Sequence, residues 1–353
     1  MKKAPLLLVA LLLILSAPTA RGEELTLSFV GDCSIGEAIQ YRDAEQGYTA
    51  TLAEKGMDWP FSLVRDILEA DDFTFANLEV VFTRRTAHES VLALPLAGPP
   101  QNAQALLYSG IDGVNTVNNH CGDFYIDGYL DTVATLNALN FPYFGSVYLN
   151  KNIPETDTLM IREVKGVRIG ALGFSFPREI NLGQIGRRIQ ALREAGCQLV
   201  IMSIHWGTEK HEMPDLGQPE FAKQLIDLGA DVVWGHHPHV LQPVQFYNGG
   251  VVMYSTGNFT FGTAHPDLDK DTGIFQLTYE LGGESPALKA FRVIPCQTAG
   301  MGDFRPRELT EEQDRQRVFK KLLFKGRDHG LTSLPASFLD TGTVLLQDGL
   351  PAE

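Results

Sequence analysis

Short apolar runs that stop at polar clusters recur along the chain. Five of these runs have the length and composition of β-strands: residues 25–30, 72–76, 112–117, 198–204 and 231–234. Residues 25–30 alternate apolar and polar positions, as in a half-buried strand, whereas residues 198–204 are almost uniformly apolar, as in a buried central strand. Further strands are predicted at residues 141–145, in a hairpin over 158–174, near 245, and at 251–255, 274–281 and 288–294.

Helices are predicted between the strands, where apolar residues recur with helical spacing. In residues 126–139, for example, Leu130, Val133 and Leu136 line one face. The remaining predicted helices are residues 61–68, 101–109, 185–195, 219–228 and 310–325. Residues 81–100 show no clear period and predict a long loop, which is either functional or a functionless insertion.

The order of these elements indicates the fold class. Strand and helix alternate over most of the chain and strands dominate later, which predicts one large α/β domain whose later strands add a second sheet. No change of composition divides the chain. With 353 residues, 44% hydrophobic and 20% charged, the chain has the composition of a folded soluble protein.

The formal net charge of −14 argues against a nucleic-acid partner. An anionic substrate stays open, because a bound metal ion can reverse the sign of a local site.

The N-terminal residues have the pattern of a secretory signal peptide. Lys2 and Lys3 precede an apolar run at residues 6–15, and Ala20 and Gly22 suit the −3 and −1 positions of a cleavage site. We therefore expect a signal peptide at residues 1–22 and export to the periplasm or the cell exterior. An uncleaved anchor is the alternative, although the run is shorter than the roughly 20 residues of a membrane span. A main domain is expected over residues 23–300, with a C-terminal helix and tail over 301–353.

The five predicted strands all end at residues that can bind a metal. These residues are Asp32; Asn77 and Glu79; Asn118, Asn119 and His120; His205; and His236, His237 and His239. One such cluster alone has ordinary explanations, since Asp32 could cap a helix and the histidines could lie in a surface loop. Five clusters at five strand ends instead predict one pocket, because the carboxyl ends of strands meet at one edge of a sheet. Carboxylate, amide and imidazole ligands suit one or two divalent ions such as Zn, Mn or Fe.

Six motifs, in order along residues 25–295, resemble the CapA, or poly-γ-glutamate capsule synthesis (PGA_cap), family. They are Gly31-Asp32, Asn77-Leu78-Glu79, Asn118-Asn119-His120-x-x-Asp123, His205-Trp206-Gly207, the tract from Gly235 to Gln242, and the tract from Tyr254 to Phe259. This family is similar to the calcineurin-type metallophosphoesterases. The resemblance therefore implies a four-layer α-β-β-α sandwich around a site for two metal ions.

The resemblance also implies roles for individual residues. It places metal ligands at Asp32, Asn119, His205, His237 and His239, and a general acid at His120. It puts His236 at the margin of the ligand set.

The sequence departs from the metallophosphoesterase pattern at two positions. Ser34 stands where the histidine of an Asp-x-His pair is usual, and Asn77 stands where an aspartate would bridge two ions, with Glu79 as a possible replacement. The number of bound ions is therefore open, from two to none. The complete set of expected metal ligands is Asp32, Asn77, Glu79, Asn119, His205, His237 and His239.

Two functions follow from the resemblance. One is a metal-dependent hydrolase acting on a phosphoester or on an amide-linked cell-surface polymer. The other is a non-catalytic accessory that helps capsule synthesis machinery to assemble, export or tether an anionic polymer. The sequence does not choose between them.

Four cysteines, two of them next to expected site residues, raise the question of a disulfide. Cys33 and Cys121 follow Asp32 and His120 directly, so they could form a disulfide near the site in an exported protein. Two small buried thiols are the alternative.

Overall fold

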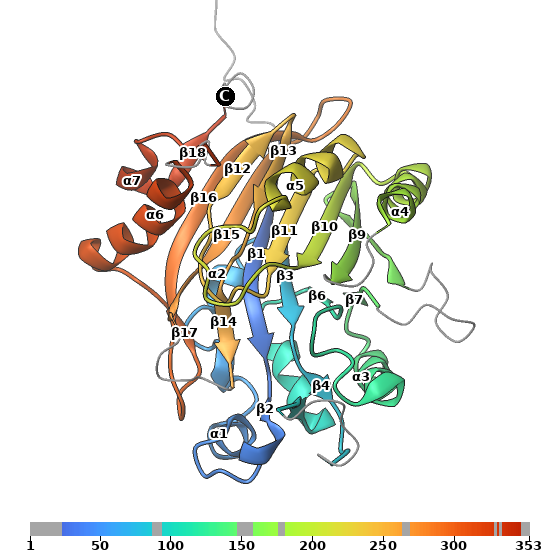
Figure 1. The fold of residues 1–353 in the computed structure, drawn as a ribbon, viewed down its shortest axis with the longest axis vertical. Coiled ribbons are helices and arrows are strands. Elements are labelled where there is room, and N and C mark those ends of the chain that lie inside the picture. The colour runs from blue at the N-terminus through green and yellow to red at the C-terminus, as the bar shows by residue number, and fades with distance from the viewer. Residues whose placement is uncertain are drawn as a thin grey trace, which may run out of the picture.

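Two β-sheets lie face to face at the centre of the molecule (Figure 1). The computed structural model describes residues 23–86, 94–146, 158–175, 181–262, 269–327, 330–331 and 334–346. The expected signal peptide at residues 1–22 lies outside these ranges. None of the helices within them is long and apolar enough to span a membrane.

The first sheet has nine strands in the order β17-β16-β15-β1-β3-β6-β7, with β14 beside β1 and β18 beside β16. Its strands are β1 (Glu24–Ser34), β3 (Phe73–Leu78), β6 (Gly113–Asn115), β7 (Tyr143–Phe144), β14 (Asn258–Phe261), β15 (Asp271–Glu280), β16 (Ala287–Thr298), β17 (Pro306–Glu308) and β18 (Thr343–Leu345). The strands β1, β3, β6 and β7 run parallel, whereas β15 and β16 are antiparallel additions.

The second sheet has six strands in the order β12-β13-β11-β10-β9-β8. These are β8 (Met160–Val164), β9 (Val167–Ser175), β10 (Leu199–His205), β11 (Val232–His236), β12 (Val244–Tyr247) and β13 (Gly250–Met253). A small third sheet joins β2 (Glu37–Ala38), β4 (Val81–Phe82) and β5 (Leu96–Gly98). The last two strands lie in the segment predicted as a long loop, of which residues 87–93 are outside the described ranges.

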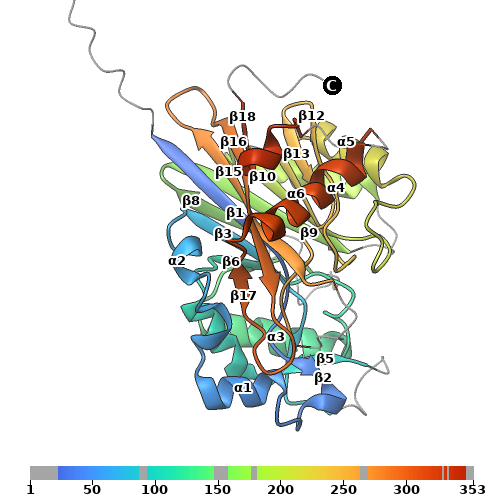
Figure 2. The same ribbon diagram turned by 90° about the vertical axis from the view of Figure 1, so that its left-hand side faces the viewer.

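Helices cover the outer face of each sheet. The first sheet packs against α1 (Tyr48–Lys55), α2 (Arg65–Leu68), α3 (Tyr125–Ala138) and the 3₁₀ helix η4 (Pro100–Tyr108). The second sheet packs against α4 (Leu182–Glu194) and α5 (Gln218–Asp227). In Figure 2, α2 and α5 lie on opposite sides of the two sheets. The molecule is therefore the four-layer α-β-β-α sandwich that the resemblance implied.

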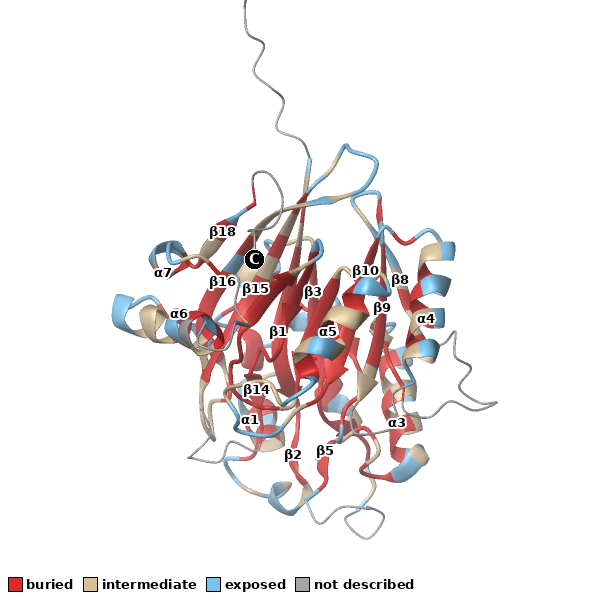
Figure 3. Cartoon of the chain, turned by 45° about the horizontal axis from the view of Figure 1, so that its top comes forward, coloured by how far each residue is buried: buried red, intermediate tan, exposed pale blue. Residues whose placement is uncertain are grey.

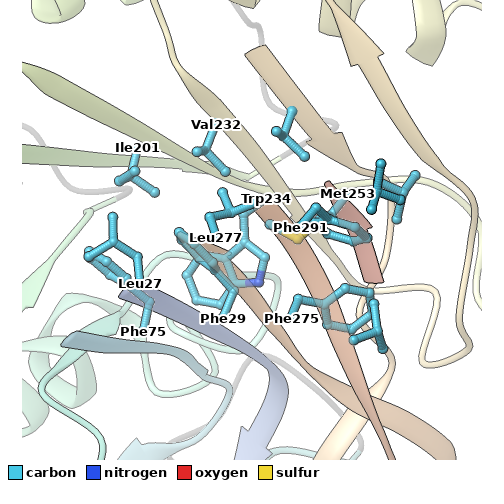
Figure 4. Packing of buried hydrophobic residues seen from close by; sticks show 14 of the residues in the cluster. Leu27, Phe29, Phe75, Ile201, Val232, Trp234, Met253, Phe275, Leu277 and Phe291 are labelled. Atoms are coloured by element: carbon cyan, nitrogen blue, oxygen red, sulfur yellow. The ribbon is translucent and has the colours of Figure 1, made fainter. Parts of the chain in front are cut away.

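Alternation along the strands divides the apolar side chains between three packed layers. Leu27 and Phe29 of β1 face the space between the sheets, where Phe29 stacks on Phe75 of β3 at a centroid distance of 5.2 Å. Trp234 of β11, in the opposite sheet, packs edge-on against Phe29 with the ring centroids 5.6 Å apart (Figure 4). Val30, the next residue of β1, instead contributes to the layer under the helices. Figure 3 shows the result, with buried central strands and exposure concentrated on the outer helices.

The C-terminal helix closes one edge of the sandwich. Val318, Phe319, Leu322 and Leu323 of α6 (Glu312–Arg327) belong to the apolar layer between the sheets, as does Phe338 of α7 (Phe338–Thr341). The two helices lie beside β16 and β12, at the edge of both sheets (Figure 1). Residues after 300 therefore complete the core.

Three expectations about the elements were wrong. The predicted helix at 61–68 is a 3₁₀ turn (Trp59–Phe61) followed by the one-turn helix α2, and the predicted helix at 101–109 is the 3₁₀ helix η4. The expectation that the later strands form the second sheet is wrong in part: β12 and β13 belong to that sheet, which begins with β8, but β15 and β16 do not. After β13 the chain crosses back, and β14 pairs in parallel with β1, which returns β15 and β16 to the first sheet.

Candidate metal centre

The site lies where strands of both sheets end. Asp32 in β1 is in register with Asn77 in β3, and His205 at the end of β10 is in register with His236 at the end of β11. All four side chains are fully buried. Because parallel strands present their carboxyl ends at one edge, the face-to-face packing of the sheets brings the two pairs together.

Two glycines allow the close backbone approach that forms this edge. A Cβ atom at Gly31 would lie 1.9 Å from the carbonyl oxygen of Gly257, and one at Gly235 would lie 2.1 Å from that of Tyr254. The segment after β13 therefore fits tightly against both β1 and β11. As a result the amide of Asp32 donates to the Gly257 carbonyl at 2.9 Å, which fixes the position of the aspartate.

Asp32, Glu79 and His205 form a compact cluster that we call the inner ligand group. Their ligand atoms all lie within 4.8 Å of one another, and all three side chains are fully buried. Within the described residues, neither carboxylate oxygen of Glu79 has a hydrogen-bond partner, and nor does Nε2 of His205. Buried polar atoms without partners are costly, so this cluster requires a proton or a cation among its atoms.

The carboxylate of Glu79 is surrounded by imidazoles. Its Oε1 lies 3.7 Å from Nε2 of His205, 3.8 Å from Nε2 of His239 and 3.9 Å from Nε2 of His120. Ligand atoms about 2.0–2.2 Å from a shared ion lie on the order of 3–4 Å apart. The donor types and the spacing therefore both fit a divalent ion such as Zn, Mn or Fe.

The environment sets different charge states within the inner ligand group. Burial, followed by repulsion from Asp32, raises the pKa of Glu79 well above its usual range. Burial acts on Asp32 in the same direction, but attraction from His236 and His239, each with Nδ1 at 3.2 Å, holds the pKa of Asp32 well below its usual range. Burial also lowers the pKa of His205 well below its usual range. These opposite shifts favour an ionised aspartate, a neutral imidazole and a protonated glutamate within the metal-free site.

Asn77 positions Asp32 and does not offer its oxygen to an ion. Its Nδ2 donates to Asp32 Oδ1 at 2.8 Å, and its Oδ1 accepts from Asn115 Nδ2 at 2.8 Å. An ionised carboxylate can only accept, so the amide nitrogen must face Asp32 and the amide oxygen must face away. The structure therefore gives Asn77 an orienting role in place of the ligand role expected from the sequence.

A second cluster, which we call the outer ligand group, consists of Glu209, His237 and His239. Their ligand atoms also lie within 4.8 Å of one another. His237 and His239 have φ values of 94° and 57°, which residues other than glycine seldom adopt and which often mark functional sites. Nδ1 of His239 lies 2.9 Å from Oδ1 of Asn258, so its Nε2 is directed toward Glu79.

His120 is held at the rim by a buried carboxylate. Its Nδ1 lies 2.8 Å from Oδ2 of Asp123, a fully buried residue, and this contact leaves Nε2 facing Glu79. Asn119 is exposed, and in the described part of the chain no hydrogen bond or ion pair joins it to either ligand group. Its neighbour Asn118 is buried instead, and its Oδ1 accepts the His120 amide at 3.0 Å.

The structure thus brings together most of the expected residues. The ring centroids of His205 and His237 are 4.7 Å apart, so the histidines of β10 and of the turn after β11 share one site. Sequence reasoning missed Glu209, although it stands two residues after the His-Trp-Gly motif, and it missed Asn115, whose position inside a strand gives no chemical signal.

Cys33 and Cys121 are buried thiols, so the disulfide considered from the sequence is wrong. Their sulfurs donate instead to the carbonyl oxygens of Gly31 at 3.6 Å and Asn118 at 3.0 Å.

Known proteins are similar to this chain in sequence. The model of the bacterial capsule synthesis protein family PGA_cap matches residues 26–263. A capsule biosynthesis protein CapA of Bacillus anthracis is 26% identical over 85% of this chain and 73% of its own length, and a PGA biosynthesis protein CapA of Bacillus subtilis is 29% identical over 69% and 65%.

A crystal structure of a hypothetical protein from Thermus thermophilus superposes with a TM-score of 0.48, at 15% identity, over 77% of this chain and 99% of its own. The family match covers every residue of both ligand groups. The chain therefore belongs to the bacterial capsule synthesis protein family PGA_cap.

Proposed function

We propose that this protein is a metal-dependent hydrolase that acts on an anionic polymer during capsule synthesis. The observation that carries the proposal is the Glu79 carboxylate, which is fully buried, has no hydrogen-bond partner in the described residues, and faces Nε2 of three histidines. A site that served only to stabilise the fold would gain more from apolar residues of similar size.

In this proposal Asp32, Glu79 and His205 hold the cation. When bound, a divalent cation would polarise a substrate oxygen and offset the negative charge of an anionic chain. The protein itself has a net charge of −14, so a local positive centre is what makes an anionic substrate compatible with this site.

His120 supplies the proton transfer. The Asp123 carboxylate accepts a hydrogen bond from Nδ1 of His120, which keeps a proton on that nitrogen and fixes the ring. Nε2 of His120, at the rim, is therefore the atom that exchanges a proton with the substrate. The 3.9 Å distance between His120 Nε2 and Glu79 Oε1 supports a proton exchange beside the inner ligand group.

Export is a part of the proposal supported by the N-terminal pattern of residues 1–22. An exported chain would meet a capsule polymer outside the cytoplasm. Immunodetection in cell fractions, with Lys2 and Lys3 replaced by glutamate as the control for a blocked signal, would test this.

The test of activity uses purified protein loaded with Zn or Mn. Cleavage of poly-γ-glutamate and of a panel of phosphoesters is measured for the wild type and for His120→Asn. Because general acid–base catalysis typically contributes 10²- to 10⁴-fold, turnover should fall by about that factor while bound metal stays constant. A His120→Asn protein as active as the wild type would remove this residue from the reaction.

A non-catalytic accessory role is the second candidate, and the hydrogen bonds of Asn77 favour it. Position 77, where the resemblance implies a bridging aspartate, carries an uncharged amide, and its oxygen is turned toward Asn115. Wild-type protein that contains metal yet cleaves none of the substrates would establish this role over the hydrolase.

A further inference from the structure

We propose that Glu209 of the segment between β10 and α5 is the third ligand of a second cation, held with His237 and His239 next to the inner ligand group. The proposal rests on the proposed function, because it concerns the same site. It names a carboxylate that the motif resemblance did not identify as a ligand, and it assigns the second ion to residues that lie in a loop and a turn.

The outer ligand group has nitrogen atoms available for an ion. Nδ1 of His239 is engaged by Asp32 and Asn258, so Nε2 remains for coordination. Nδ1 of His237 is buried and lacks a hydrogen-bond partner among the described residues. A carboxylate oxygen of Glu209 lies within 4.8 Å of both imidazoles, and two imidazoles with one carboxylate are a common ligand set for Zn and related ions.

The segment that carries Glu209 is fastened directly after that residue. The amide of Lys210 donates to the Pro238 carbonyl at 2.8 Å, which ties the residue after Glu209 to the turn between the two histidines. Nε2 of Gln242 donates to the carbonyls of His211 at 2.7 Å and Met213 at 3.0 Å. These bonds hold the loop against the turn, so the proximity of the three ligands is built into the fold.

The C-terminal helix adds a further attachment. Lys325 of α6 forms an ion pair with Glu212, three residues after Glu209. Elements that are far apart in the sequence therefore converge on the loop.

The chemistry explains why a carboxylate is needed here. Asn77 is uncharged and therefore cannot bridge two ions as a carboxylate would. Ser34 offers no imidazole, and its hydroxyl donates to the Gly36 carbonyl at 3.4 Å. A second cation next to the inner ligand group would be repelled by the first unless additional negative charge lay nearby. Glu209 supplies that charge from the solvent side, and its exposure implies a weaker and exchangeable ion.

The experiment measures metal stoichiometry without reference to catalysis. Metal-free full-length protein is titrated with Mn²⁺ by isothermal calorimetry, and free Mn²⁺ is followed by electron paramagnetic resonance. The variants are Glu209→Gln and His237→Gly, the latter because glycine tolerates the positive φ of residue 237. Glu220→Gln, at an exposed position in the first turn of α5, is the matched control. Circular dichroism checks that each variant is folded.

The wild type and Glu220→Gln should bind two ions, one tightly and one weakly. Glu209→Gln and His237→Gly should keep the tight ion and weaken the other by at least about tenfold. Equal binding of two ions by Glu209→Gln and wild type would overturn the inference. A wild type that binds one ion, unaffected by Glu209→Gln, would overturn it while leaving the proposed function in place, whereas a wild type that binds none would contradict both.

Discussion

The inner and outer ligand groups lie side by side but are built differently. Asp32 and His205 belong to strands and Glu79 directly follows one, so the inner ligand group is held by sheet hydrogen bonds and is completely buried. In the outer ligand group, Glu209 is exposed, and His237 lies in a turn with positive φ. His239 connects them, because its two nitrogens face Asp32 and Glu79.

This difference in burial predicts different metal-binding properties for the two ligand groups. A buried, preorganised group binds an ion without changing shape, but it leaves costly unpaired atoms when it is empty. A solvent-facing group on a loop costs little when it is empty and can exchange its ion or admit substrate. We therefore expect the inner ligand group to set metal affinity and the outer ligand group to set access.

The largest effect is expected from removing the carboxylate at the centre of the inner ligand group. In Glu79→Gln, affinity for the tight ion should fall by more than about 100-fold, because even residues that only support metal ligands contribute about 10- to 100-fold. Calorimetric titration with Mn²⁺ measures the change, with Glu220→Gln as the control. Unchanged tight binding in Glu79→Gln would show that the outer ligand group is the principal site and would reverse the comparison.

A smaller effect is expected from the residue that orients His120. Asp123→Asn should lower kcat by roughly 10- to 100-fold with little change in KM or metal content, because the ring loses its fixed orientation. The double variant with His120→Asn should be no slower than His120→Asn alone, since the two residues act as one unit. Additive losses in the double variant would instead assign Asp123 a structural role in holding the Leu96 amide, which donates to Asp123 at 2.7 Å.

The smallest effect concerns the pH dependence of stability in the metal-free protein. The raised pKa of Glu79 means that the folded state holds its proton more tightly than the unfolded state does. Its contribution to the free energy of unfolding is therefore lost as pH rises from its ordinary value of 4.5 through the raised folded value. The lowered pKa of His205 acts in the opposite sense, favouring stability as pH rises toward 6.5.

Comparison of metal-free wild type with Glu79→Gln isolates the first contribution, because both proteins retain His205. Relative to Glu79→Gln, the wild type should lose roughly 1–3 kcal/mol across this range, as expected for a buried group that loses its proton without a partner. Urea unfolding at several pH values measures it, and saturation with Mn²⁺ should abolish the difference in slope. Parallel pH profiles of the two metal-free proteins would indicate that Glu79 has a partner in solution.

The sequence predicted the fold class and much of the site for a specific physical reason. Strand periodicity identified β1, β3, β10 and β11, and polar residues after each apolar run placed Asp32, Glu79 and His205 at strand ends. Motif resemblance then supplied the layer order. The 3₁₀ geometry of η4 was missed, because an amphipathic spacing does not distinguish it from an α-helix over so few residues.

The sequence by itself determined which types of ligand the site contains. The order of residues shows both the ligand types and their positions directly after buried strands. Tertiary structure alone decided which of those residues come together in the two ligand groups. Asn115 donates a hydrogen bond to Asn77, and Asn77 donates one to Asp32, so Asn77 orients Asp32. These bonds join three strands through side chains whose orientation depends on their neighbours. Glu209 lies beside the histidines because the residues that follow it are hydrogen-bonded to Pro238 and Gln242. Such long-range contacts produce no periodic pattern in a sequence.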